Sequence, residues 1–165
     1  MCHLRLLLCF LVCSIWLSAA SAPVNPFRQD EAFWKMLTPA ARVVLADVQV
    51  TVRAECDTFV GGVYHSATNS IEICNIDLRE QPDRLRHEAL HALDWSNGRQ
   101  ATNSNRFVGA TLANKLYARA EALYGGWFLE GELFAMVPIV VGWDFDQLPA
   151  EVAGFYAAWF EEAER

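Results

Sequence analysis

The sequence predicts an α+β fold, in which a small mixed or antiparallel sheet is followed by a long helix and a helical C-terminal half. Two observations carry this prediction. Segments rich in Val, Thr, Phe and Ile lie within residues 49–74, and the segments after about residue 81 have helical spacing or helical end signals. Strands grouped ahead of helices are typical of α+β domains rather than of alternating α/β folds.

Two short helices are expected before the sheet. Asp30 is the predicted N-cap of a helix that reaches Leu37, and Thr38 is the N-cap of a second helix that begins at Pro39 and continues to about Val48. Asp and Thr side chains accept hydrogen bonds from the free N–H groups of a first turn, and proline is favoured at the first helical position.

Strands are expected at residues 49–60 and between Tyr64 and Cys74, with Gly61-Gly62 as the turn between them. The run from Ser70 to Ile73 alternates polar and apolar residues, as a half-buried strand does. The strand is therefore expected to end near Cys74.

The longest clearly delimited helix is expected over Pro82–Ser96. It has Pro82 and Asp83 in its first turn and is stopped by Asn97-Gly98. Three later helices are expected at Phe107–Tyr124, Glu130–Met136 (ending near Pro138) and Pro149–Glu162.

Length and charge limit the function classes. The chain has 165 residues, of which 53% are hydrophobic, and a net charge of −7. This length suits one domain, and the apolar content excludes intrinsic disorder. The negative charge argues against nucleic acid as a partner, because phosphate backbones require a basic face.

The N-terminus has the pattern of a secretory signal peptide. Met1–Arg5 carries a positive charge, Leu6–Leu17 is apolar, and small residues follow, which allows cleavage after Ala20 or after Ala22. Residues 1–20 are therefore read as the signal and residues 21–165 as a single domain. We expect a secreted or extracytoplasmic monomer that contacts a membrane only if the signal remains uncleaved as an anchor.

Cleavage changes the cysteine count. Cys2, Cys9 and Cys13 leave with the signal, and Cys56 and Cys74 remain. An even pair in an exported chain predicts one disulfide, with two unbonded buried thiols as the alternative.

The expected helix over residues 82–96 contains His87-Glu88-Ala89-Leu90-His91, an H-E-x-x-H motif. Residues four apart project from one helix face, so both imidazoles can bind one Zn²⁺. Glu88 is offset by about 100° and lies at the flank of that ion. It is the candidate general base that takes a proton from the zinc-bound water.

A third protein ligand is needed, because catalytic sites of this kind use two histidines, a glutamate and a water. Glu132 is the preferred candidate, since Ala135 leaves room beside the metal; Glu130, Glu121 and Asp94 stay open. The apolar run from Leu133 to Trp143 is too short to span a bilayer and is expected to be buried behind the metal.

Asp94 shares the helix face of the two histidines, seven residues after His87. We expect its carboxylate to accept an imidazole N–H and so fix the tautomer of a ligand. Oxyanion stabilisation needs a further group. Tyr64, His65, Tyr117 and Tyr124 are candidates among which the sequence does not choose.

The segment Gly61-Gly62, the strand ending at Cys74 and the motif His87-Glu88-x-x-His91-x-x-Asp94 resemble the zincin metallopeptidases with a downstream glutamate ligand, the gluzincin-like type. Within them, the pattern is most similar to the family of the mitochondrial inner-membrane processing peptidase that also assists ATP-synthase assembly. The resemblance implies a zincin-like α+β fold and a proteolytic role for the motif. The export signal departs from that family, so its substrate and assembly role do not carry over.

We therefore expect a secreted zinc metallopeptidase that acts on a peptide or protein substrate, with one Zn²⁺ as cofactor. The alternative is a catalytically weak or inactive zincin-fold binding or assembly protein with a structural zinc. A structural site is closed by four protein ligands. Here those would be His87, His91, Asp94 and Glu132.

Overall fold

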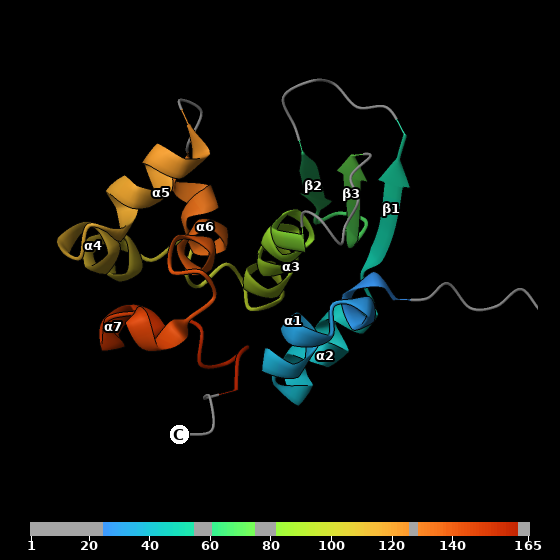
Figure 1. Cartoon of the computed structure of the whole chain (residues 1–165), viewed down its shortest axis with the longest axis horizontal. Helices are drawn as coiled ribbons and strands as arrows, with labels where there is room; N and C mark the ends of the chain where they lie inside the picture. Colours follow the sequence, from blue (N-terminus) through green and yellow to red (C-terminus); the bar gives the residue numbers. More distant parts are fainter. Residues whose placement is uncertain (1–24, 55–60, 75–81, 126–128, 162–165) are drawn as a thin grey trace, which may run out of the picture.

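In the computed structural model, a central helix, α3, lies between a three-stranded sheet and a group of C-terminal helices (Figure 1). The structure describes residues 25–54, 61–74, 82–125 and 129–161. The α+β fold class and the small mixed sheet are confirmed. In chain order, the described elements are η1 (Pro26–Gln29), α1 (Glu31–Met36), α2 (Pro39–Ala46), β1 (Gln49–Arg53), β2 (Gly62–His65), β3 (Ser70–Cys74), α3 (Pro82–Ser96), α4 (Asn105–Ala113), α5 (Leu116–Tyr124), η2 (Glu130–Glu132), α6 (Leu133–Val140), η3 (Phe145–Gln147) and α7 (Ala150–Ala153).

The sheet has the strand order β1-β3-β2, with β1 parallel and β2 antiparallel to β3. On β3, Ile71 and Ile73 are fully buried, whereas Glu72 between them forms an ion pair with Arg53. This alternation turns one face of the sheet toward the core. In the described sheet, β2 is an edge strand that pairs only with β3. Strand β2 also contacts α3, the helix that packs beside the sheet.

The two N-terminal helices begin where the sequence predicts. The Asp30 carboxylate accepts a hydrogen bond from the backbone N–H of Phe33, and the Thr38 hydroxyl accepts one from Ala41. Each cap satisfies an N–H group that a first helical turn would otherwise leave free.

The predicted bounds of α3, Pro82–Ser96, are confirmed. The helix packs against α6, α2, β2 and β3, so it is buried around most of its circumference. Leu85, Leu90 and Leu93 contribute to this core. The helix stops where Gly98 adopts a φ of 68°, a conformation that glycine permits at low cost.

The single long helix predicted over Phe107–Tyr124 is wrong, because the structure has α4 and α5 there instead. The break falls at Lys115, whose φ is 60°, and the Asn114 side-chain amide donates to the carbonyl of Ala110 at 2.8 Å. An Asn side chain that bonds the backbone in this way competes with helix continuation.

The helix expected over Glu130–Met136 is found as the 3₁₀ turn η2 followed by α6, which passes the expected stop near Pro138 and ends at Val140, with Pro138 inside the helix. Proline has no N–H, so the carbonyl four residues earlier, that of Phe134, loses its helical donor. The buried Tyr156 hydroxyl donates to that carbonyl at 2.8 Å and replaces the missing bond. The expected burial of the apolar run from Leu133 to Trp143 is confirmed in part: Leu133–Pro138 and Val141 are buried, whereas Ile139, Val140 and Trp143 are partly exposed.

The last predicted helix, Pro149–Glu162, is reduced to α7, Ala150–Ala153, followed by turns. The C-terminal segment instead pairs with the junction between α1 and α2. Phe160 forms a bridge with Leu37, and the N–H of Glu161 donates to Met36 at 2.8 Å. These contacts use backbone groups that a longer helix would have bonded internally.

Several predictions lie outside the described residues. These are the signal peptide over residues 1–20, its cleavage after Ala20 or Ala22, residues 55–60 of the strand expected over 49–60, the helix end at Glu162, and Cys56. The export signal and the Cys56–Cys74 disulfide therefore stay predictions. Among the described helices, none combines the length and apolar character that a bilayer span requires.

Candidate metal centre

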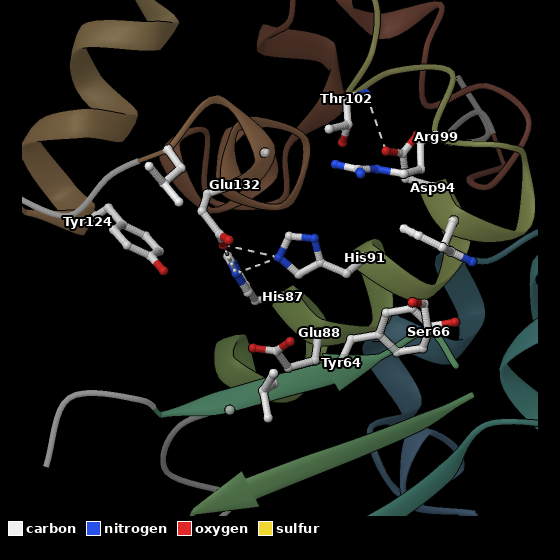
Figure 2. Close-up of a pocket in the computed structure, with 15 residues that line it drawn as sticks. Tyr64, Ser66, His87, Glu88, His91, Asp94, Arg99, Thr102, Tyr124 and Glu132 are labelled. Atoms are coloured by element: carbon white, nitrogen blue, oxygen red, sulfur yellow. Dashed lines mark hydrogen bonds and ion pairs between the residues drawn. The ribbon is translucent and has the colours of Figure 1, made fainter. Parts of the chain in front are cut away.

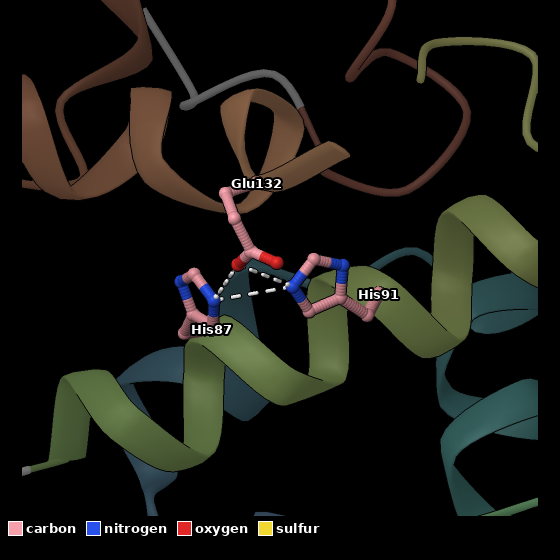
Figure 3. Close-up of side chains that lie close together, drawn as sticks. All are labelled: His87, His91 and Glu132. Carbon is pink, nitrogen blue, oxygen red and sulfur yellow. Dashed lines mark hydrogen bonds and ion pairs between the residues drawn. The ribbon is translucent and has the colours of Figure 1, made fainter. Parts of the chain in front are cut away.

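Three side chains from two separate elements converge on one point (Figure 3). His87 and His91 lie four residues apart on α3, and Glu132 ends η2 and caps α6. The Glu132 Oε2 atom lies 2.9 Å from His87 Nε2 and 3.1 Å from His91 Nε2, and the two Nε2 atoms are 3.1 Å apart. The packing of α6 on α3 brings the distant glutamate to the histidine pair.

The donor set suits a zinc ion. Four tetrahedral ligands, each about 2.0–2.1 Å from Zn²⁺, lie about 3.3 Å from one another. The three donor atoms here are 2.9–3.1 Å apart, which is close to that spacing. Two imidazole nitrogens and one carboxylate oxygen are also the donors of catalytic zinc sites, which leave a fourth position open. His87, His91 and Glu132 therefore fit the ion that the sequence predicts.

Glu132, the preferred candidate of the sequence, is the carboxylate that the structure brings to the histidines. Of the described residues, no other Asp or Glu joins this cluster. Glu130, two residues away, and Glu121 on α5 are both exposed. Glu130 and Glu132 lie in the 3₁₀ turn η2, where residues two apart point in different directions. The sequence alone does not predict this turn or which of the two glutamates faces the histidines.

Glu132 and His91 shift each other's pKa values in opposite directions. Burial alone would raise the pKa of Glu132, but hydrogen bonds from His87 and His91 hold it well below its usual range. Burial alone would lower the pKa of His91, yet the hydrogen bond to Glu132 and the charges of Glu132, Glu88 and Asp94 raise it. The carboxylate is thus anionic, as a metal ligand must be.

The Glu88 carboxylate lies between α3 and β2, beside the cluster (Figure 2). Its side chain is nearly buried, and burial raises the pKa of the carboxyl despite the nearby imidazoles and a hydrogen bond from the backbone N–H of Tyr64. A Cβ atom at Gly62 would lie only 3.0 Å from Glu88, so the bare glycine backbone makes room for this side chain. Glu88 lines the same cavity as both histidines, a hollow of about 480 Å³.

The prediction that Asp94 accepts an imidazole N–H is wrong. Its carboxylate accepts hydrogen bonds from the backbone N–H groups of Ala101 and Thr102, at 3.0 and 3.2 Å. Asp94 is buried near the end of α3. The loop that follows the helix places these two amide groups beside its carboxylate. Its influence on His91 is through charge. Both carboxylate oxygens accept bonds from the loop, and among the described residues Asp94 is not part of the group whose ligand atoms converge on one point.

The four candidates for oxyanion stabilisation separate in space. Tyr124 lines the cavity near Glu132, with its ring 6.2 Å from that of His87 (Figure 2). Tyr64 also lines the cavity, but its hydroxyl donates to Asn69. His65 faces Glu72 on the sheet, and Tyr117 is absent from the described lining. Burial, with the charges of Glu132 and Glu88, raises the pKa of Tyr124, so its hydroxyl keeps its proton at neutral pH.

Sequence reasoning missed part of the cavity wall. Trp95, Arg99 and Thr102 line the cavity. Figure 2 shows Arg99 and Thr102 beyond His91, on the side away from Tyr124. Trp95 follows His91 by four residues, so helical spacing could have identified it. Arg99 and Thr102 lie in a loop, where no periodicity relates them to the motif.

Comparison with known proteins adds no family to this picture: no protein-family model, no curated protein and no solved structure matches the chain.

Proposed function

We propose that the protein is a secreted, zinc-dependent metallopeptidase. The observation that carries the proposal is the convergence of His87 Nε2, His91 Nε2 and Glu132 Oε2 within 3.1 Å of one another, beside the buried carboxylate of Glu88. The zincin-like character of the fold belongs to the same proposal, and its support is the motif on α3 beside the edge strand β2.

Bound at these three residues, Zn²⁺ would supply a Lewis acid that polarises a carbonyl and lowers the pKa of a water. The chain contributes the proton transfer. Glu88 is placed to accept a proton from the water that attacks the peptide carbonyl, and to return it to the nitrogen as the C–N bond breaks. The raised pKa of Glu88 suits this role, because it makes the carboxylate a stronger proton acceptor than an exposed glutamate.

The edge of β2 supplies a surface for an extended peptide. The N–H of Cys74 donates to the carbonyl of Gly61, so alternate residues of this segment bond to β3. Gly62 and Tyr64 therefore direct their backbone groups toward the other side, where the N–H of Tyr64 reaches Glu88. An added peptide strand would hydrogen-bond to this edge and lie across the cavity.

The test compares wild type with E88Q and E132Q, and uses E130Q as the matched control. Purified proteins are assayed for zinc content and for cleavage of a peptide library. We expect one zinc per wild-type chain. We expect E88Q to keep its zinc and lose 10²-fold or more in hydrolysis, the contribution of a general base.

E132Q is expected to lose zinc affinity, whereas E130Q, with its exposed side chain, is expected to match wild type in both assays. Wild-type rates in E88Q would exclude the peptidase mechanism. Zinc binding without hydrolysis in wild type would favour the alternative, a binding or assembly protein with a zincin fold.

A further inference from the structure

The cavity contains one cationic group that the proposed mechanism does not use. Among the described residues that line it, Arg99 is the only lysine or arginine. Three carboxylates line the same cavity, those of Glu88, Asp94 and Glu132. A guanidinium group in such a place either balances these charges or recognises an anionic part of a ligand.

The three acids are already engaged elsewhere. Glu132 accepts hydrogen bonds from the histidines, Asp94 accepts them from the loop backbone, and Glu88 is held against β2. Within the described part of the chain, no ion pair within 4.0 Å and no hydrogen bond joins the Arg99 side chain to an acid. Its planar N–H donors are therefore left for a ligand in the cavity.

The position of Arg99 is fixed by the fold. Its backbone N–H donates to the carbonyl of Asp94 at 2.7 Å, and its φ is 58°, a conformation that residues with a Cβ atom rarely adopt. The guanidinium carbon lies 5.3 Å from the ring centre of Trp95, a cation–π contact that orients the side chain. Two hydrogen bonds to Asp94 secure the following turn, which brings Thr102 into the lining.

Resting on the proposed peptidase function, we propose that Arg99, with Trp95 and Thr102, forms a subsite for a carboxylate of the peptide substrate. A guanidinium pairs with a carboxylate through two parallel N–H···O bonds, which a lysine cannot reproduce. Figure 2 shows the Arg99 side chain reaching over His91, on the side of the metal cluster away from Tyr124. A peptide bound across the cluster would thus place an anionic group on one side only.

Two parts of a peptide carry this chemistry, its C-terminal carboxylate and an Asp or Glu side chain. The test uses a short peptide that wild type cleaves, in four forms: a free acid or amide at the C-terminus, combined with Glu or Gln on the same side of the cleaved bond. Hydrolysis is measured for wild type, R99M, R99K and R106M. Arg106 is an exposed arginine at the start of α4 and is absent from the described cavity lining, which makes it a matched control.

We expect R99M to raise KM tenfold or more for the anionic peptides, with kcat little changed, and to leave the neutral amide-Gln form unaffected. R99K should recover only part of this loss, and R106M should match wild type. The form that is sensitive to R99M identifies the source of the carboxylate. Equal kinetics for all four peptides, or equal effects of R99M on all four, would overturn the subsite.

Binding separates this inference from the proposed function. Calorimetry with the same four peptides is carried out on E88Q and on E88Q/R99M, where hydrolysis does not interfere. If wild type fails to hydrolyse any peptide, the peptidase function fails, and Arg99-dependent binding of the anionic forms still supports the subsite. Anionic and neutral forms that bind E88Q equally well would refute it.

Discussion

At the scale of single residues, the Asp94 carboxylate stabilises the loop that follows α3. It is buried and accepts the backbone N–H groups of Ala101 and Thr102. In D94N, an amide NH₂ replaces one oxygen and faces a backbone donor, so one buried N–H loses its acceptor. We expect a loss of about 2 kcal/mol in the free energy of unfolding, measured by urea denaturation.

Asp83 provides the control for this substitution, since it lies on the same helix with its carboxylate half exposed. It accepts the indole N–H of Trp143, and an Asn oxygen at that position can accept the same bond. D83N should therefore stay within about 0.5 kcal/mol of wild type. Equal stabilities for D94N and D83N would show that Asp94 does not secure the loop.

The ion pair between Asp30 and Arg86 joins α1 to α3. Two hydrogen bonds connect the guanidinium to the carboxylate, at 2.6 and 2.9 Å, and both side chains are mostly buried. D30N removes the charge but keeps an N-cap for α1, whereas D30A removes both. We expect D30N to lose about 2 kcal/mol and D30A about 1 kcal/mol more in the free energy of unfolding.

The same pair gives a pH dependence. Burial alone would raise the pKa of Asp30, but the hydrogen bonds from Arg86 and Phe33 and the charge of Arg86 lower it overall. A lowered folded-state pKa contributes stability above the unfolded pKa of about 4, and this contribution is lost as the pH falls through the folded value. The difference in stability between wild type and D30N should thus be full at pH 6 and shrink below pH 4. A difference that stays constant from pH 6 to pH 2 would contradict this origin.

At the scale of secondary-structure elements, the contact between β2 and α3 depends on the small size of Gly62. A Cβ atom there would lie 2.8 Å from Ile73 Cδ1 and 3.0 Å from Glu88. At Gly61, the three atoms nearest to a Cβ all belong to the side chain of Arg84, which is exposed and can move. G62A should therefore lose about 1–3 kcal/mol of stability, the range for overpacking, and displace Glu88.

G61A is the matched control, and it should keep both stability and hydrolysis near wild-type values. Thermal unfolding and peptide cleavage are measured for both variants. G62A is expected to lower kcat and to change KM little, since Glu88 acts in the chemical step. A G62A variant with wild-type kcat would show that the space beside Glu88 is not needed.

The ends of elements show how far the sequence predicts this fold. Local chemistry gave the start of α1, the start of α2 and both ends of α3, because a cap, a proline or a glycine acts within one turn. The break at Lys115 and the continuation of α6 through Pro138 were not predicted. The second depends on Tyr156, eighteen residues further along, whose hydroxyl replaces the donor that proline lacks.

Some residues of the candidate site can also be predicted from local sequence, and others depend on how distant elements pack. Helical spacing alone places His87 and His91 on one face with Glu88 at their flank. Glu132 could be ranked first among distant acids, but its approach to the histidines depends on the packing of α6 against α3. The prediction for Asp94 is wrong because its partners are two backbone N–H groups, which side-chain patterns do not reveal. Arg99 reaches the cavity from a loop, which periodicity cannot describe.

At the scale of the whole molecule, the C-terminal segment pairs with the junction between α1 and α2. The pairing of Phe160 with Leu37, and the hydrogen bonds of Glu161 to Met36 and of Thr38 to Trp159, connect residues more than a hundred positions apart. The candidate metal centre makes a second long-range connection, between α3 and the start of α6. Both connections join the C-terminal helices to the part of the chain that carries the sheet.

Metal binding should consequently stabilise the entire fold. A ligand that binds only the folded state adds RT ln(1 + [L]/Kd), about 2.7 kcal/mol at a hundredfold excess over Kd. Addition of Zn²⁺ to chelator-treated protein should raise the Tm of wild type, since the ion joins two elements that are far apart in sequence. The E88Q variant should show the same rise, because Glu88 is not among the three converging ligands.

The decisive comparison is between E132A and E130A, two substitutions in one 3₁₀ turn. E132A should lose most of the zinc-dependent rise in Tm, whereas E130A should keep it. E132A also removes a carboxylate that accepts hydrogen bonds from both histidines, so its Tm without metal must be recorded as the reference. If zinc raises the Tm of E132A as much as that of wild type, the ion binds elsewhere, and the link between α3 and α6 is not made by metal.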